Sequence, residues 1–260
     1  MANNIGDILN DEQRARLQQV ADEQHRREQQ RSEARDRSQM LAAIIEQRRR
    51  QGFKPIDHFL RWQCPDADRL LMHGLVRMLG DRAQWLPEYD AVAEWLADNR
   101  GQGLMCLGNV GRGKSLLTCD IIPMIFEAGY VCEADSGARL ARPFVCTARE
   151  LGDVWTEVQR HRIIVVDEVG QEGVVNQYGE HHDYFDELVM LAERKGKTLI
   201  LSSNLTKAEL FGGTERTADG TERTLTGRYS DQRIRDRLTS TLRRVAFIGD
   251  SLRKQTRKGG

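Results

Sequence analysis

The chain has 260 residues, of which 39 are basic and 39 acidic, and its mean hydropathy is −0.59. This length suffices for one substantial domain with an appendage, and the balanced charge singles out neither nucleic acid nor a membrane surface as a partner. No stretch approaches the roughly 20 apolar residues of a membrane span, and the first residues lack the pattern of a signal peptide. The 5 cysteines form no C-x-x-C pair, which indicates reduced thiols and a cytoplasmic location.

Residues 1–52 differ in composition from the rest and are predicted to form a polar helical arm. Between Asp11 and Arg50 the sequence is rich in Gln, Arg and Glu and contains neither Gly nor Pro, which favours a helix. Its apolar stripe is too thin for burial in a globular core. Two interpretations stay open. The arm is either solvated and partly disordered, or it is a docking or self-association helix whose apolar end is Leu41, Ile44 and Ile45.

Residues 53–260 have the composition of a globular domain that ends in a basic tail, 253–260. Hydrophobic periodicity predicts helices that start after the cap Asp66 and over 87–98, 116–122, 148–159 and 183–194. Further short helices are expected after Thr206 and Asp231. Strands are predicted at 103–107, 129–132, 143–147, 162–167, 197–204 and 244–248, and a loop or hairpin at 211–229. This alternation favours a parallel sheet covered by helices on both faces.

The stretch from Gly108 to Ser115, Gly-Asn-Val-Gly-Arg-Gly-Lys-Ser, matches the P-loop pattern G-x-x-x-x-G-K-[ST] between a strand and a helix. Its glycines allow the backbone to point N–H groups at phosphate oxygens. The lysine would reach the β- and γ-phosphates, and the serine hydroxyl would ligate Mg²⁺. The residues expected to hold the nucleotide are Gly108, Asn109, Val110, Gly111, Arg112, Gly113, Lys114, Ser115 and Leu116.

Two later strands end in polar residues that suit hydrolysis. Ile163 to Val166 is followed by Asp167 and Glu168, the form of a Walker B strand. Asp167 would hold Mg²⁺ through water, and Glu168 would act as the base towards the attacking water. Asn204, at the end of the next apolar strand, could orient that water or simply close the strand as an Asx turn. Because ligands of parallel sheets bind at the carboxyl ends of the strands, Ser115, Asp167 and Asn204 are expected to converge there.

These motifs, followed by Arg233-Ile-Arg-Asp-Arg237-Leu238 and Gly249-Asp-Ser-Leu-Arg253, occur in an order that resembles the AAA+ ATPases of the DnaC/IstB group. The resemblance runs from about residue 60 to the C-terminus. It implies an α/β P-loop NTPase fold of the AAA+/ASCE type, with five parallel strands in the order 5-1-4-3-2 and an N-terminal helical arm. It also implies that residues 53–260 form a Mg²⁺-dependent ATPase domain.

The resemblance assigns roles to three more side chains. Asn204 would be the sensor-one residue, and Arg253 the sensor-two residue that contacts nucleotide in cis. Arg237 would be an arginine finger that reaches a neighbour's γ-phosphate, a task that suits an always-charged guanidinium. Arg233 and Arg235 compete for the finger role, and helical spacing does not choose among the three.

Three functions are compatible with this sequence. In the first, the protein resembles a DnaC-type helicase loader in DNA replication, with the arm docking a replicative helicase. In the second, it resembles an IstB-like transposition ATPase that engages DNA and a transposase. In the third, it is an ATP-binding adaptor with little turnover. The resemblance implies self-association through a shared ATP site and contact with single-stranded or duplex DNA, and no membrane partner is expected.

Overall fold

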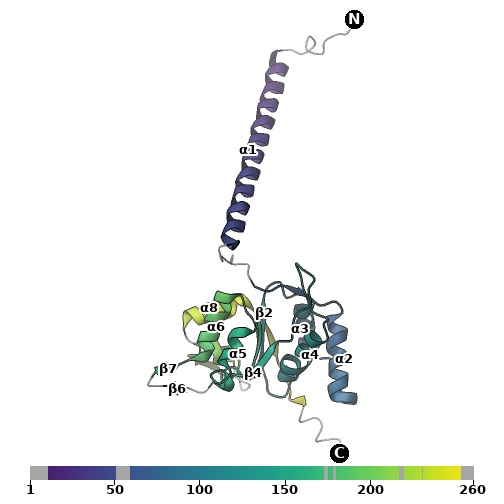
Figure 1. The fold of residues 1–260 in the computed structure, drawn as a ribbon, viewed down its shortest axis with the longest axis vertical. Coiled ribbons are helices and arrows are strands. Elements are labelled where there is room, and N and C mark those ends of the chain that lie inside the picture. The colour runs from purple at the N-terminus through teal and green to yellow at the C-terminus, as the bar shows by residue number, and fades with distance from the viewer. Residues whose placement is uncertain are drawn as a thin grey trace, which may run out of the picture. The chain divides into compact units, whose positions relative to one another are not determined.

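The computed structural model describes residues 11–50, 59–172, 175–177, 180–216, 220–229 and 231–252. It divides into two compact units, residues 1–57 and 58–260. The described residues of the first form the helix α1 (Asp11–Arg50), shown in Figure 1. Every residue of α1 whose burial is described is exposed except Ile45, which is half-buried. The predicted helix is confirmed, and exposed i,i+4 ion pairs such as Arg27–Glu23 (2.7 Å) lie along it.

The second unit is built on a five-stranded parallel sheet. Its strands, in spatial order, are β11 (Leu242–Phe247), β2 (Gly103–Gly108), β8 (Thr198–Ser203), β5 (Ile163–Asp167) and β4 (Phe144–Thr147). Every neighbouring pair is parallel. Counted along the chain, this order is 5-1-4-3-2, so the predicted topology is confirmed. Within this sheet, the first strand in sequence, β2, lies between the last two, β8 and β11.

Helices cover both faces of this sheet (Figure 1), and each face has its own apolar core. Alternate strand residues supply the two cores: Leu104 and Cys106 face one side, and Met105 and Leu107 the other. The first face packs against α2 (Ala67–Leu79), α3 (Pro87–Ala97) and α4 (Ile122–Glu127). The second packs against α5 (Trp155–Arg160), α6 (Tyr184–Lys195), α7 (Lys207–Phe211) and α8 (Gln232–Thr241).

The helix that follows β2 begins with a wide turn. Residues Leu116–Ile121 (η3) are π-helical, with the Ile122 N–H donating to the carbonyl of Leu117, and α4 continues from there. Pro123, at the junction, has no N–H and its ring excludes a normal α-helical contact with the preceding turn, which accounts for the widening. The predicted helix out of the glycine-rich loop is therefore confirmed, with a local distortion.

Shorter elements complete the unit. Two 3₁₀ turns are η2 (Gly80–Arg82) and η4 (Ala148–Glu150), and three antiparallel ribbons pair β1 (Trp62–Gln63) with β3 (Cys132–Glu133), β6 (Val175–Gln177) with β7 (Glu180–His182), and β9 (Gly213–Arg216) with β10 (Glu222–Leu225). The β9–β10 hairpin lies within the segment 211–229, as predicted. No helix in the described parts of the chain combines the length and the apolar character needed to cross a bilayer.

Three local predictions were wrong. Residues 129–132 supply only the start of β3, which pairs outside the main sheet. Asp66 precedes α2 in the left-handed conformation (φ 56°) and its side chain caps nothing. The single helix expected over 148–159 is broken into η4, a turn and α5. Gly152 lies in that turn and packs closely on the Tyr184 ring, because a Cβ at this position would come within 2.9 Å of it.

Candidate active site

The loop between β2 and its helix requires glycine at three positions. Gly108, Gly111 and Gly113 all have positive φ, 116°, 81° and 87°. A Cβ at Gly108 would lie 2.5 Å from the Phe247 carbonyl oxygen, and one at Gly113 would lie 2.6 Å from the Tyr89 hydroxyl. The backbone therefore curls tightly between β11 and α3, in the form that directs successive N–H groups towards an anion.

Lys114 lies under this loop and is only 4% exposed. Its ammonium donates to the carbonyls of Gly108 (2.9 Å) and Asn109 (2.8 Å) and to Oδ1 of Asn204 (3.0 Å). Burial lowers the pKa of Lys114, and the nearby Asp167 carboxylate acts in the opposite direction. The structure thus brings together Lys114 and Asn204, which are 90 residues apart in sequence.

Asp167, at the end of β5, accepts hydrogen bonds from three directions. The Ser115 hydroxyl donates to Oδ1 at 3.1 Å and the Glu168 N–H donates to the same oxygen at 3.0 Å. The Ser202 hydroxyl also donates to this carboxylate. A hydroxyl and a carboxylate in contact are the oxygen donors that Mg²⁺ prefers. The side chains predicted as metal ligands therefore lie together, and their chemistry fits the ion.

Glu168 begins the turn after β5 with φ at 57°, a conformation that few residues other than glycine adopt. The Gln171 N–H donates to the Glu168 carbonyl at 2.9 Å and closes the turn. The Val169 N–H donates to the Ser202 carbonyl at 2.8 Å and ties the turn to β8. A non-glycine residue is held in this conformation only where its surroundings enforce it, as they do in many functional sites.

The glycine-rich loop, Glu168 and Asn204 line one pocket of about 650 Å³. Its walls include eight of the predicted site residues: Val110, Gly111, Gly113, Lys114, Ser115, Leu116, Glu168 and Asn204. The volume lies within the range of small-molecule and cofactor sites, roughly 300–1,000 Å³. The sheet order, the loop and the pocket decide the architecture together. The chain has a P-loop NTPase fold.

Six of the fourteen described residues that line this pocket were not among the predicted site residues. Leu252 and five residues of the segment from α2 to α3 complete the walls: Leu79, Asp81, Arg82, Gln84 and Tyr89. Burial raises the pKa of Tyr89 to about 12, with the Glu88 carboxylate adding to the shift, so the hydroxyl stays a donor at neutral pH. No motif marks the five positions from α2 to α3, because their role depends on how these helices pack beside the loop.

The side chain of Arg112, a P-loop residue, is engaged in contacts within the protein. Its guanidinium pairs with Glu88 of α3 at 2.6 Å, and the two side chains are 11% and 7% exposed. It also donates to the Asp250 carbonyl at 3.4 Å. Arg112 thus contributes its backbone to the phosphate-binding loop, while its charge is neutralised by Glu88, a residue that no sequence motif marks.

The segment after β11 docks on the P-loop. The Asn109 side chain donates to the Gly249 carbonyl at 2.9 Å, and the Leu252 N–H donates to the Gly111 carbonyl at 3.0 Å. The motif expected to carry the sensor-two residue therefore reaches the nucleotide pocket. Arg253 itself lies outside the described residues.

Arg237 lies elsewhere. Its guanidinium forms an ion pair with Glu193 of α6, and its side chain is 24% exposed. It shares a small crevice with Gly103 and Leu199, which lie at the amino ends of β2 and β8, opposite the P-loop. By contrast, Arg233 is 77% exposed and pairs with Asp231 at the start of α8. Neither arginine lines the P-loop pocket of its own chain among the described residues.

No protein-family model matches the chain, and no curated protein matches it. Among solved structures, the crystal structure of DnaI is similar to 58% of this chain and 72% of that chain, with 14% sequence identity and a TM-score of 0.38. A likeness this loose carries no argument about function. The P-loop NTPase assignment rests on the strand order and the loop.

Proposed function

We propose that this protein binds ATP with Mg²⁺ in the P-loop pocket and hydrolyses it. One observation carries the proposal. Lys114, Ser115, Glu168 and Asn204, contributed by the loop and by two other strand ends, line a single pocket, and Asp167 accepts a hydrogen bond from Ser115. Phosphoryl transfer to water requires such a set of groups: a lysine that binds phosphate, two oxygen ligands for the metal, a carboxylate base and a carboxamide.

In this proposal each residue has one task. The loop N–H groups and Lys114 bind the phosphates, and Ser115 and Asp167 hold Mg²⁺, which neutralises phosphate charge when bound. Glu168 accepts the proton of the attacking water, and the Asn204 carboxamide orients that water. The hydrogen bond from Lys114 to Asn204 must be exchanged for contacts with nucleotide.

Two substitutions test the proposal. Lys114→Ala should abolish both ATP binding and turnover, because it removes the charge that faces the phosphates. Glu168→Gln keeps the shape of the site but removes the base, so ATP should still bind while turnover falls by about 10² or more. Binding of a fluorescent ATP analogue and phosphate release would be measured on both variants. A wild type as slow as Glu168→Gln would sink the hydrolysis proposal and favour an ATP-binding adaptor.

We further propose that the ATPase acts as a helicase loader of the DnaC type, with α1 as the docking arm. The order of motifs from the P-loop to Gly249–Leu252 supports this reading, as does the exposed apolar end of α1, where Met40, Leu41 and Ile44 are 69%, 59% and 48% exposed. An exposed apolar helix segment of this kind suits insertion into a partner's groove.

Affinity capture from the native host tests the loader assignment. The bait is the full chain carrying Glu168→Gln, loaded with ATP, and the control is the same chain with Leu41→Ser and Ile44→Ser. A replicative helicase recovered by the first bait and lost with the second is the expected result. Recovery of a transposase without a helicase would instead identify an IstB-like transposition ATPase.

A further inference from the structure

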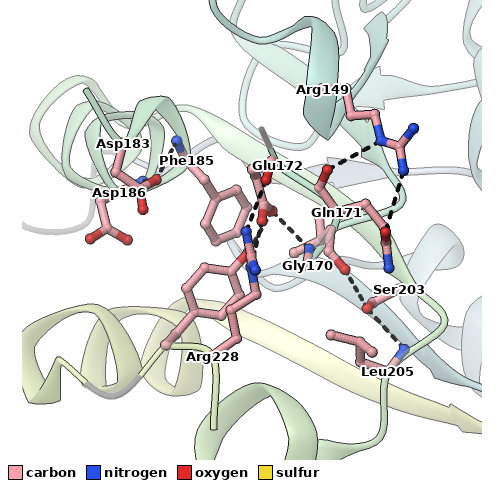
Figure 2. A network of polar contacts seen from close by, with 12 residues as sticks. Arg149, Gly170, Gln171, Glu172, Asp183, Phe185, Asp186, Ser203, Leu205 and Arg228 are labelled. Carbon is pink, nitrogen blue, oxygen red and sulfur yellow. Dashed lines mark hydrogen bonds and ion pairs between the residues drawn. The ribbon is translucent and has the colours of Figure 1, made fainter. Parts of the chain in front are cut away.

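The turn that carries Glu168 ends at a second, largely buried carboxylate. The side chain of Glu172 is 10% exposed. Its Oε1 accepts from the Gly170 N–H at 2.8 Å and from the Tyr229 hydroxyl at 2.5 Å, and its Oε2 accepts from Arg228 Nε at 2.9 Å. Arg228 also donates to the Glu172 carbonyl at 3.0 Å. Figure 2 shows Glu172 between Gly170 and Arg228, so both of its carboxylate oxygens are engaged within the protein.

The same turn is anchored on its other side by β8. The Ser203 hydroxyl donates to the Val169 carbonyl, and the Val169 N–H donates to the Ser202 carbonyl. Gly170 has a φ of 98°, and a Cβ there would lie 2.4 Å from Leu205 Cδ1. The backbone that presents Glu168 is therefore held between the end of β8 and the Glu172 carboxylate.

The partners of Glu172 belong to the segment that enters α8. Tyr229 is 5% exposed, and its ring packs on Phe185 of α6 at a centroid distance of 4.7 Å. Its N–H donates to the Leu210 carbonyl at 2.7 Å. Two residues later, Asp231 caps α8 by accepting from the Arg233 N–H. Glu172 thus joins a turn of the active site to a segment 56 and 57 residues away.

Glu172 is not among the described residues that line the nucleotide pocket, so it acts through others. We propose that Glu172 is a positioning residue that holds Glu168 in its left-handed conformation and ties it to the entry of α8. This inference rests on the proposed hydrolytic function of Glu168. A carboxylate suits the task because it accepts from an arginine, a phenol and a backbone N–H at once, and hydrogen bonds to charged groups are the stronger ones.

One variant of the full chain, Glu172→Gln, tests the proposal against a matched control. Glu172→Gln keeps the size of the side chain and removes the charge that engages Arg228. The control, Gln171→Ala, removes a neighbouring side chain whose contact is Arg149 on the exposed side of the same turn. Because small displacements of a catalytic group are costly, Glu172→Gln should lower kcat by about tenfold while Kd for the fluorescent ATP analogue changes less than about twofold. Gln171→Ala should leave both within about twofold of wild type.

Should Glu172→Gln fail to fold, Arg228→Gln replaces it, since Arg228 is 41% exposed and its loss spares the other two hydrogen bonds. The same loss of kcat without loss of affinity is expected, to a smaller extent. Wild-type kcat in either folded variant would overturn the proposal. A parallel loss of ATP affinity, kcat and Tm would also overturn it, by showing a structural role alone. A wild type without hydrolysis is a separate result that refutes the proposed function itself.

Discussion

At the scale of single residues, Lys114 is a buried cation whose hydrogen-bond acceptors in the protein are uncharged. Two backbone carbonyls and the amide oxygen of Asn204 accept hydrogen bonds from its ammonium group, and burial lowers the pKa of Lys114. A phosphate would supply the negative charge that these acceptors lack. The phosphates of the proposed nucleotide would therefore pair with a buried positive charge that is already present at the loop.

Asp186, in the first turn of α6, is a second residue whose surroundings disfavour its charge. Its Oδ1 is buried and has no hydrogen-bond partner among the described residues. Burial first, and then the neighbouring carboxylates of Asp183, Asp231 and Glu172, raise its pKa from 3.8 to about 6, against the opposing charge of Arg233. The folded protein therefore binds this proton more tightly than the unfolded chain does.

This shift predicts a pH dependence of stability. Between about pH 4 and 6 the folded state holds more protons at Asp186 than the unfolded state, so the contribution of this residue to stability falls as the pH rises through that window. Asp186→Asn removes the charge. The variant should be more stable than wild type at pH 7, and its advantage should shrink as the pH falls towards 4.

Urea unfolding of both proteins at pH 7, 6, 5 and 4 measures this difference. Asp153→Asn is a suitable control, because Asp153 is exposed in the turn before α5. A constant difference between Asp186→Asn and wild type across the pH series would contradict the assignment of the raised pKa to this residue.

At the scale of elements, the turn after β5 depends on one glycine. Gly170→Ala combines a positive φ with a contact of 2.4 Å between the new Cβ and Leu205. Gly220→Ala, in the β9–β10 hairpin, carries a similar φ of 86° with no heavy atom within 4 Å of the new Cβ. The two variants share the backbone strain and differ in the clash.

Gly170→Ala is therefore expected to destabilise the protein more than Gly220→Ala does, by about 1–3 kcal/mol, the usual range for overpacking. Urea denaturation compares the two free energies of unfolding. Equal losses would mean that Leu205 moves aside without cost, and that the turn is less tightly held than its contacts imply.

The sequence predicted the framework of these elements better than their details. The order of the five strands followed from the resemblance that the glycine-rich loop and the Asp-Glu strand end carry, because those motifs belong to one topology. The break of the 148–159 helix was missed. Gly152 lies in the break beside the ring of Tyr184, which comes from a distant element, and helical periodicity carries no signal of that neighbour. The sequence Gly-Thr-Glu-Arg-Thr occurs at 213–217 and again at 220–224, and these two segments contain most of the residues of β9 and β10.

The site shows the same division. Lys114, Ser115, Asp167 and Glu168 were identified because their chemistry demands a fixed spacing along the chain. The carboxylates that hold this machinery in place, Glu88 on Arg112 and Glu172 on the turn, were not identified. Their partners lie far away in sequence, and an ordinary glutamate in a helix or loop carries no local signal of such a contact.

At the scale of the whole molecule, a shared active site predicts rescue between two defective subunits. Lys114→Ala subunits lack nucleotide but keep their arginines, and Arg237→Ala subunits keep a P-loop but lack the proposed finger. Mixing the two should restore part of the hydrolysis, because Arg237 of the first can complete the P-loop of the second. Phosphate release would be measured over a range of mixing ratios.

The same mixture made with Arg233→Ala compares two of the three candidate arginines, Arg233 and Arg237. Arg233 is exposed at the start of α8, whereas Arg237 must leave Glu193 before it can reach a neighbour. Rescue with Arg233→Ala but full activity of Arg237→Ala alone would transfer the finger role to Arg233. No rescue at any ratio with either variant would argue against a shared site.

The place of β2 between β8 and β11 has a consequence for how the protein is made. The P-loop is hydrogen-bonded to the segment after β11, because Asn109 donates to the carbonyl of Gly249, 140 residues away. At about 5–20 residues per second, ribosomes expose the complete loop motif roughly 7–30 s before the segment that shapes it. During synthesis the chain thus carries every residue of the loop motif well before the segment that contacts it, because that segment follows the last strand, β11.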